Sequence, residues 1–153
     1  MLQNKTSIEF DENKQMLYEN IVKPYLEDYT GKIFEDVCKQ YFLNNIASDK
    51  LPFVYEQIGR WWGTNKIEKI EEEIDLIMCT NNKKKMFYIE CKWRNEKVGI
   101  NVLNELIKKA ECFDKGIQKY YGICSKSGFK KEVIDYAKDN PNVYLYDLKQ
   151  IVN

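Results

Sequence analysis

Residues 71–93 of this 153-residue chain read EEEIDLIMCTNNKKKMFYIECKW, and they decide the fold. Two largely apolar runs, 73–78 and 86–93, flank the polar run TNNKKK. Apolar and aromatic runs of this length are typical of strands, and a short polar run between two of them is typical of a turn. The stretch therefore predicts a β-hairpin whose turn is centred near Asn82 and Lys83.

Charged residues interrupt the apolar pattern of both predicted strands. Side chains alternate between the two faces of a strand. On the first strand, one face is expected to carry Ile74, Leu76 and Met78, and the other Glu73, Asp75 and Ile77. On the second strand, one face is expected to carry Met86, Tyr88, Glu90 and Lys92, and the other Phe87, Ile89, Cys91 and Trp93. With this turn, Asp75 lies roughly opposite Glu90. Two like charges paired across strands destabilise a sheet unless something compensates them, and a divalent metal ion is the simplest compensation.

Composition excludes several classes of function. The chain has 24 basic and 24 acidic residues and no histidine. Catalysis by Ser-His-Asp or Cys-His groups and histidine-containing zinc sites are therefore excluded. The balanced charge gives no global positive field, so any nucleic-acid binding must use a local patch. A hydrophobic content of 44% indicates one globular domain rather than a disordered chain.

The five cysteines are Cys38, Cys79, Cys91, Cys112 and Cys124, without a CxxC pair. An odd, unclustered set predicts reduced and mostly buried thiols, not a disulfide framework or a zinc knuckle. The chain has no N-terminal hydrophobic signal and no long apolar run. We therefore expect a cytoplasmic protein that does not span a membrane.

The rest of the chain predicts alternating helices and strands. Residues 1–15 are polar and are expected to be a linker or a disordered N-terminus, followed by a single domain over 16–153. We expect helices over 15–29 (interrupted at Pro24), 30–43, 98–113 and 128–140, and strands over 53–62, 73–78, 86–93, 119–125 and 143–148. In the helix over 30–43, Glu35 lies at the margin of the apolar arc and Asp36 points well away from it. Glu35 is therefore the acidic residue expected near the sheet.

Several of these segments resemble a known superfamily. Asp75 followed by Glu90-x-Lys92 resembles the PD-(D/E)XK, or restriction-endonuclease-like, nucleases. Five ordered motifs further resemble the C-terminal domain of unknown function of archaeal-type DEXX-box ATPases, over roughly residues 25 to 150: GKIFEDVCKQYF (31–42), IGRWWG (58–63), EIDLI (73–77), IECKW (89–93) and SKSGF (125–129). The resemblance implies an α/β fold: a restriction-endonuclease-like core with a mixed central sheet flanked by helices, in the order α-β-β-β-α-β plus a further helix and strand.

The resemblance also implies a site. Asp75, Glu90 and the backbone carbonyl of Cys91 would hold magnesium, with manganese as a substitute, and Glu35 would contribute directly or through a water. Lys92 would orient the attacking water and stabilise developing negative charge. The alternative is that Asp75 and Glu90 are solvated strand residues and Lys92 is their ion-pair partner, which is the commoner role of an isolated E-x-K. The apolar surroundings of Asp75 and the position of Glu35 favour the metal site.

Nucleic-acid contacts are expected from residues outside this cluster. Arg60 could contact a phosphate and Trp61 or Trp62 could stack on a base, although paired tryptophans at a strand end more often pack in a core. Lys126 and Lys130 could face phosphates, although such a charge run is usually a solvated helix start.

The predicted function is a magnesium-dependent endonuclease that hydrolyses DNA. The alternative is a non-catalytic nucleic-acid-binding or regulatory module of a larger ATPase, and a nuclease for RNA or nucleotides would share the same site. The expected partners are DNA and a P-loop ATPase, attached covalently or not, with a homodimer also compatible. The chain itself has no GxxxxGK[ST] motif.

Overall fold

The structure is a computed structural model that describes residues 7–153, with side chains described from residue 12 onward. It divides the chain into two compact units, residues 1–33 and residues 34–153. The sheet and all the candidate site residues belong to the second unit.

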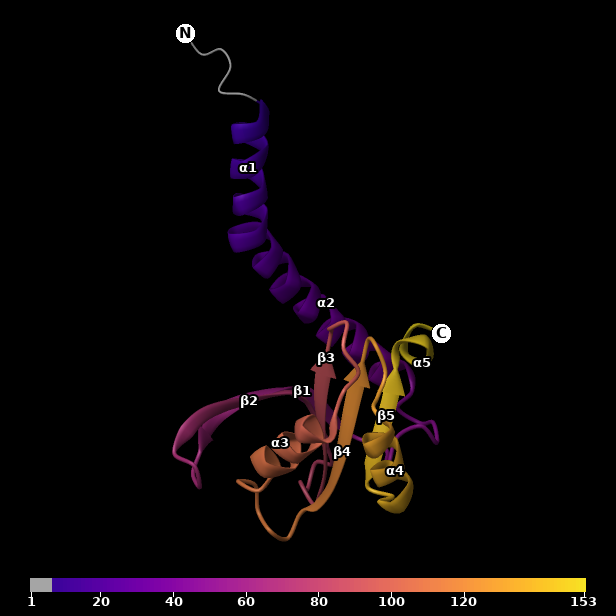
Figure 1. Ribbon diagram of the computed structural model, residues 1–153. Coiled ribbons are helices and arrows are strands. Elements are labelled where there is room, and N and C mark those ends of the chain that lie inside the picture. Colours follow the sequence, from indigo (N-terminus) through magenta and orange to yellow (C-terminus); the bar gives the residue numbers. More distant parts are fainter. Residues whose placement is uncertain (1–6) are drawn as a thin grey trace. The chain divides into compact units, whose positions relative to one another are not determined.

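Five strands form one mixed sheet in the order β1-β2-β3-β4-β5 (Figure 1). The strands are β1 (Gln57–Asn65), β2 (Ile70–Cys79), β3 (Lys85–Lys92), β4 (Gln118–Ser125) and β5 (Val143–Asp147). The first three strands pair antiparallel, and β3, β4 and β5 pair in parallel. Parallel neighbours need crossover connections, and these contain α3 (Ile100–Ala110) and α4 (Lys131–Asp139). The predicted α/β fold class, with the order α-β-β-β-α-β and a further helix and strand, is confirmed.

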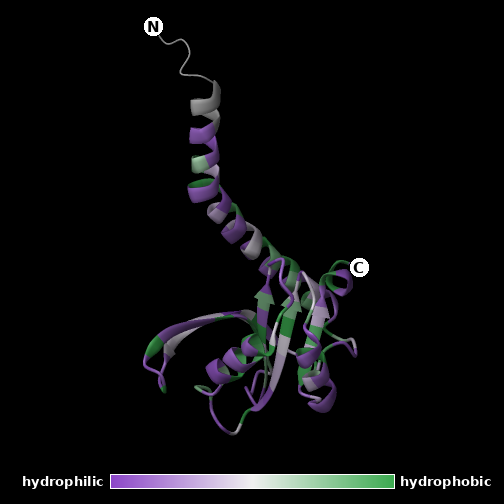
Figure 2. Cartoon of the chain, in the orientation of Figure 1, coloured by the Kyte–Doolittle hydropathy of each residue, from purple (hydrophilic) through white to green (hydrophobic). Residues whose placement is uncertain are grey.

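Helices cover both faces of the sheet. Phe34, Cys38, Tyr41 and Phe42 of α2 (Lys23–Asn44) and Ile151 of α5 (Leu148–Val152) pack with the face that carries Phe87 and Ile89. Val102, Leu103, Leu106 and Ala110 of α3 pack with the face that carries Met86 and Tyr88. Figure 2 shows hydrophobic residues along the central strands, as expected for strands covered on both sides.

The hairpin has the predicted register. Leu76 pairs with Ile89 and Cys79 pairs with Met86, so Asp75 and Glu90 each come directly after the last residue of the pairing on its own strand. Lys83 takes a positive φ of 55° in the turn. The symmetry of the sequence about the turn was therefore enough to bring the two acidic residues to the same end of the pairing.

A β-bulge in β2 corrects one predicted face. Gly59 pairs with Ile77 and Trp61 pairs with Ile74, so two residues of β2 lie opposite the single residue Arg60. The extra residue reverses the alternation, and Ile74 packs with Ile77 in the core under α3 rather than sharing a face with Leu76. A bulge redirects the side chains beside it, and Asp75 is one of the two residues in the bulge.

The first unit contains helix where a linker was expected. α1 spans Ser7–Leu17, a π-helical turn spans Tyr18–Val22, and α2 begins at Lys23. The predicted interruption at Pro24 is wrong, because α2 runs through it to Asn44. The wide π turn ends two residues before the proline, and such a turn accommodates the missing N–H of a proline in a helix. Residues 1–6 lie outside the described residues, and the predicted domain boundaries stay predictions.

Other predictions shift in detail. β1 begins at Gln57 rather than residue 53, and the preceding residues Leu51 and Tyr55 are buried without belonging to a strand. α5 was not predicted. All five cysteines are free thiols, but they are not unclustered, since Cys38, Cys91 and Cys124 meet in the core. Among the described residues, no helix has both the length and the apolar character needed to cross a membrane.

Candidate active site

Asp75 lies where β2 separates from β3. β2 pairs with β3 only over Leu76–Cys79, and the residues before Asp75 pair with β1 alone. Its Oδ2 accepts a hydrogen bond of 2.8 Å from the Cys91 backbone N–H. Burial, and then the charge of Glu90, raise the pKa of Asp75 to about 7. The bulged strand therefore holds a carboxyl group in a place where its charge is poorly compensated.

Glu90 is the most deeply buried charged side chain of the cluster, with 9% of the residue exposed. Its Oε1 lies 2.9 Å from the Lys92 Nζ. Its Oε2 is buried and has no hydrogen-bond partner among the described residues, and the Lys109 Nζ is 3.7 Å away, beyond hydrogen-bond reach. A buried carboxylate oxygen without a hydrogen bond is costly and marks a place where a ligand would be favourable.

Glu35 reaches the same cluster from α2. Its carboxyl group is within hydrogen-bonding range of that of Asp75. Burial raises the pKa of Glu35, Glu73 and Glu90 raise it further, and Arg60 opposes the rise. Asp36 is exposed. The wheel position that separated these two acidic residues predicted the geometry correctly.

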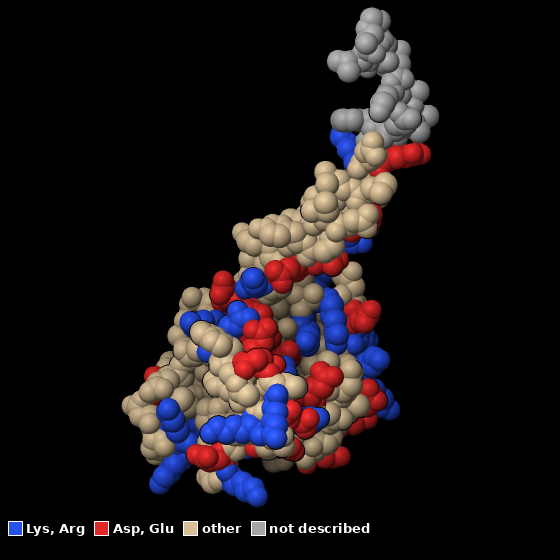
Figure 3. Space-filling view, turned by 90° about the vertical axis from the view of Figure 1, so that its left-hand side faces the viewer, with Lys and Arg blue, Asp and Glu red and all other residues tan. Residues whose placement is uncertain are grey.

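Three cationic side chains surround the carboxylates. Lys92 pairs with Glu90, and Arg60 on β1 pairs with Glu73 and lies close enough to affect Glu35 and Asp75. Lys109 on α3 donates a 3.1 Å hydrogen bond to the Glu73 carbonyl oxygen. Acidic and basic side chains intermingle on the face of the molecule shown in Figure 3. The chain has no net charge, but positively and negatively charged side chains are concentrated around these carboxylates.

Lys109 was missed by the sequence analysis, although a signal was present. It follows Val102 by seven residues, so at ~100° per residue it lies within about 20° of this buried position on the helical wheel. A lysine on the apolar side of a helix that covers a sheet is placed to reach a charge on that sheet. Only 23% of its side chain is exposed.

The donor set fits a hard divalent cation. Asp75 and Glu90 each use one carboxylate oxygen within the protein, and the other oxygen of Glu90 is free of hydrogen bonds from the described residues. Oxygen donors suit magnesium or manganese, which usually retain several waters. The ligand oxygens of Glu35, Asp75 and Glu90 do not all lie within 4.8 Å of one another. At least one of the three would therefore reach a shared ion only through a water or after its side chain moves.

The residues predicted to contact nucleic acid divide into partly buried and exposed ones. Trp61 packs against Phe113, with ring centroids 5.1 Å apart, and so serves the core. Trp62 is 71% exposed. Lys126 donates to Asn95 and lies over the Trp93 ring, and the exposed Lys130 occupies the N-cap position of α4 without a side-chain capping hydrogen bond. Trp62 and Lys130 are therefore the residues of this set that nucleic acid could reach, whereas Trp61 packs in the core, which was the alternative to base stacking.

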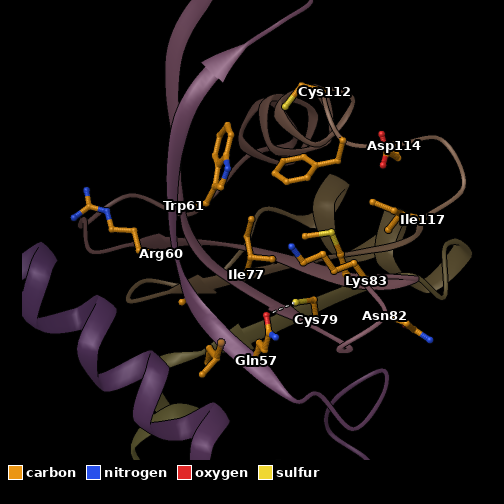
Figure 4. A pocket seen from close by; sticks show the side chains of 14 residues that line it. Gln57, Arg60, Trp61, Ile77, Cys79, Asn82, Lys83, Cys112, Asp114 and Ile117 are labelled. Atoms are coloured by element: carbon orange, nitrogen blue, oxygen red, sulfur yellow. Dashed lines mark hydrogen bonds between the residues drawn. The ribbon is translucent and has the colours of Figure 1, made fainter.

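A pocket of about 590 Å³ lies beside this cluster on the α3 side of the sheet (Figure 4). Its lining includes Trp61, Ile77, Phe113 and Asp114. In Figure 4 the Arg60 side chain points away from the other side chains that line the pocket. None of the carboxylates Glu35, Asp75 and Glu90 lines the pocket, so it is separate from the proposed metal ligands.

A family model matches residues 1–112, and its description is "Archaea bacterial proteins of unknown function", DUF234. The chain belongs to the DUF234 family. A relative from Methanocaldococcus jannaschii, an uncharacterized protein named MJECL04, is 32% identical over 131 residues. That match covers 84% of this chain but 27% of the relative, so the chain spans about a quarter of the length of this family member.

Three solved chains align with this DUF234 chain, and they include protein VC1899 and the endonuclease AspBHI. Protein VC1899 from Vibrio cholerae aligns with a TM-score of 0.52 and 17% identity, over 77% of this chain and 29% of that one. The DNA modification-dependent restriction endonuclease AspBHI aligns with a TM-score of 0.36 and 16% identity, over 80% of this chain and 34% of that one. The first likeness concerns the fold alone, and the second is too distant to carry an inference about activity.

Proposed function

We propose that this DUF234 chain is a magnesium-dependent nuclease domain that hydrolyses phosphodiester bonds in DNA. The observation that carries the proposal is the buried Glu90 Oε2, which lacks a hydrogen bond from the described residues and lies beside the poorly compensated carboxyl group of Asp75. A fold without chemistry would gain stability by replacing these groups with apolar ones. Their presence beside two lysines is what a phosphodiester-cleaving site needs.

Asp75, Glu90 and the Cys91 carbonyl would hold the metal, and Glu35 would complete its surroundings through a water. When bound, magnesium would supply neutralisation of charge on the phosphoryl oxygens and activation of water. Lys92 lies on the same strand face as Glu90 and is partly exposed, so its ammonium group would orient water and stabilise negative charge as the bond breaks. Lys109 would hold the Glu90 carboxylate in position by its charge.

The nucleic acid would approach over the exposed residues beside the cluster. Trp62 would stack on a base, and Arg60 would exchange its ion pair with Glu73 for a phosphate. Double-stranded DNA, single-stranded DNA and RNA all offer these groups, so the substrate assay needs all three.

The test is cleavage by the purified chain of plasmid DNA, single-stranded DNA and RNA in magnesium, manganese or EDTA. Glu90→Gln keeps the shape of the side chain and removes its charge, and it should abolish cleavage. Glu96→Gln is the matched control, because Glu96 is an exposed carboxylate in the loop after the same strand. Cleavage that survives EDTA, or that Glu90→Gln leaves unchanged, would contradict the proposed mechanism.

The alternative, a nucleic-acid-binding or regulatory module of a larger ATPase, draws support from the greater length of the M. jannaschii relative. A chain that corresponds to about a quarter of a longer protein is well suited to be one module of it. Binding of nucleic acid without cleavage under every metal condition would favour this alternative.

A further inference from the structure

Three cysteine sulfur atoms meet inside the second unit, on the sheet face opposite the Glu90 side chain. They belong to Cys38 of α2, Cys91 of β3 and Cys124 of β4, and all three lie within 4.8 Å of one another. Cys91 and Cys124 are direct neighbours in the parallel pairing of β3 with β4. Cys38 comes from the helix that covers that face. All three are free cysteines.

The surroundings of these sulfurs are apolar. Cys38 and Cys124 are fully buried, and Cys91 is partly exposed as a residue. Phe34, Phe87 and Tyr146 belong to the same core cluster. A single buried cysteine commonly serves as a small apolar side chain. Three that converge from three separate elements form a different arrangement, because each element directs its sulfur to the same point.

The spacing agrees with coordination of one metal ion. With metal–sulfur bonds of about 2.3 Å, three sulfurs in a plane around one ion lie about 4.0 Å apart. The observed spread allows this distance without a large movement of any strand. Within the described part of the chain, no other group of three cysteine, aspartate or glutamate residues meets the same spacing.

We propose that Cys38, Cys91 and Cys124 form a three-sulfur site for Cu⁺, a thiophilic d¹⁰ ion that accepts three sulfur ligands. Sulfur ligands select such ions and disfavour magnesium, so this site and the carboxylate site would take metals of different classes. Three S–metal bonds form, and each thiol gives up one proton to solvent. The assignment of this site does not rest on the proposed nuclease activity.

The position of the site gives it a structural consequence. One ion would join α2 to both β3 and β4. Glu35 lies one helical turn before Cys38, and Glu90 and Lys92 flank Cys91 in the chain. A metal held by these sulfurs would therefore fix the backbone on which three residues of the carboxylate cluster stand.

The experiment loads the full chain with a soft metal. The protein is refolded with excess Cu⁺ in the presence of a phosphine reductant, then freed of unbound metal by gel filtration. Metal per chain is measured by mass spectrometry, and X-ray absorption at the metal edge reports the neighbouring atoms. Cys38→Ser and Cys91→Ala test the ligands, and Cys112→Ser controls for a thiol outside the group. Glu90→Gln controls for metal bound at the carboxylates.

We expect one ion per chain with a sulfur-only shell of three in the wild type, in Cys112→Ser and in Glu90→Gln. Cys38→Ser and Cys91→Ala should lose it while circular dichroism shows that they are folded. If a ligand variant fails to fold, the sulfur count measured on the wild type decides the matter. A wild type that retains no metal, or an ion surrounded by oxygen, would overturn the proposal. Equal loading of the folded ligand variants would overturn it as well.

Discussion

Replacement of Asp75 by asparagine should stabilise the metal-free protein, although it removes a proposed metal ligand. Burial and Glu90 raise the pKa of Asp75 from 3.8 to about 7. Between these two values the folded state binds more protons than the unfolded state, so the stability of the wild type falls as pH rises through this window. Above the folded-state pKa the cost is fully present, and below the unfolded-state pKa it is absent.

The magnitude follows from the two pKa values. At about 1.36 kcal/mol per pKa unit the cost at about pH 8 is at most about 4 kcal/mol, and relaxation around the charged group leaves an expected ~2 kcal/mol. The asparagine side chain of the variant keeps an oxygen to accept the Cys91 N–H bond and gains an NH₂ that can donate to Glu35. For a chain of this length, ~2 kcal/mol raises the melting temperature by roughly 4–8 °C.

The assay is thermal unfolding in EDTA and in manganese at several pH values. In EDTA, Asp75→Asn should exceed the wild type at about pH 8, and the difference should shrink toward about pH 4. In manganese at about 100 times its Kd, the wild type should gain about 2.7 kcal/mol and the variant should gain little. Asp36→Asn, which changes an exposed carboxylate on α2, should match the wild type throughout. A variant that is less stable than the wild type in EDTA at the alkaline end, or equally stabilised by manganese, would refute the reasoning.

Three further predictions concern residues around the cluster. Lys92→Ala should cut cleavage by about 10²-fold or more and should also lower the melting temperature, because the Lys92 side chain is 29% exposed and pairs with the buried Glu90 carboxylate; Lys97→Ala, an exposed control, should leave both unchanged in the same assays. Glu35→Gln should weaken manganese binding by less than tenfold in calorimetry, since its contact is proposed to pass through a water; complete loss of binding would make it a direct ligand. Trp62→Ala should weaken DNA binding by the ~1–3 kcal/mol typical of one stacked base, whereas Trp61→Ala should instead lower stability by ~2 kcal/mol or more; the reverse result in binding and unfolding assays would exchange their roles.

The parts of the site that local sequence patterns encode were predictable. Strand alternation and the symmetry of the turn placed Asp75 opposite Glu90, and the helical wheel separated Glu35 from Asp36. Each inference needed only the geometry of one element or one hairpin. These are also the interactions in which the residues concerned lie close in sequence or on one regular surface.

Features that depend on several elements at once were not predictable in this way. The bulge in β2 arises from its pairing with β1, and the order of apolar and polar residues within β2 does not predict the extra residue. The meeting of Cys38 with Cys91 and Cys124 depends on how α2 lies on the sheet, which the wide spacing in sequence conceals. Pro24 was expected to interrupt a helix, but a π turn before it allows the helix to continue.

The charges around the cluster explain how a chain without net charge could bind a polyanion. Four carboxylates (Glu35, Glu73, Asp75 and Glu90) lie with three cationic groups (Arg60, Lys92 and Lys109). Without metal the local charge is slightly negative, or near neutral when Asp75 carries a proton. One divalent cation would make it positive, and a phosphate would then be attracted to the place where the chemistry is proposed. The surrounding lysines would add to this attraction only after the carboxylates are neutralised. In this arrangement the metal would act first as a switch for nucleic-acid binding. Without the metal the carboxylates would repel the nucleic acid, and with the metal bound they would help to position the nucleic acid.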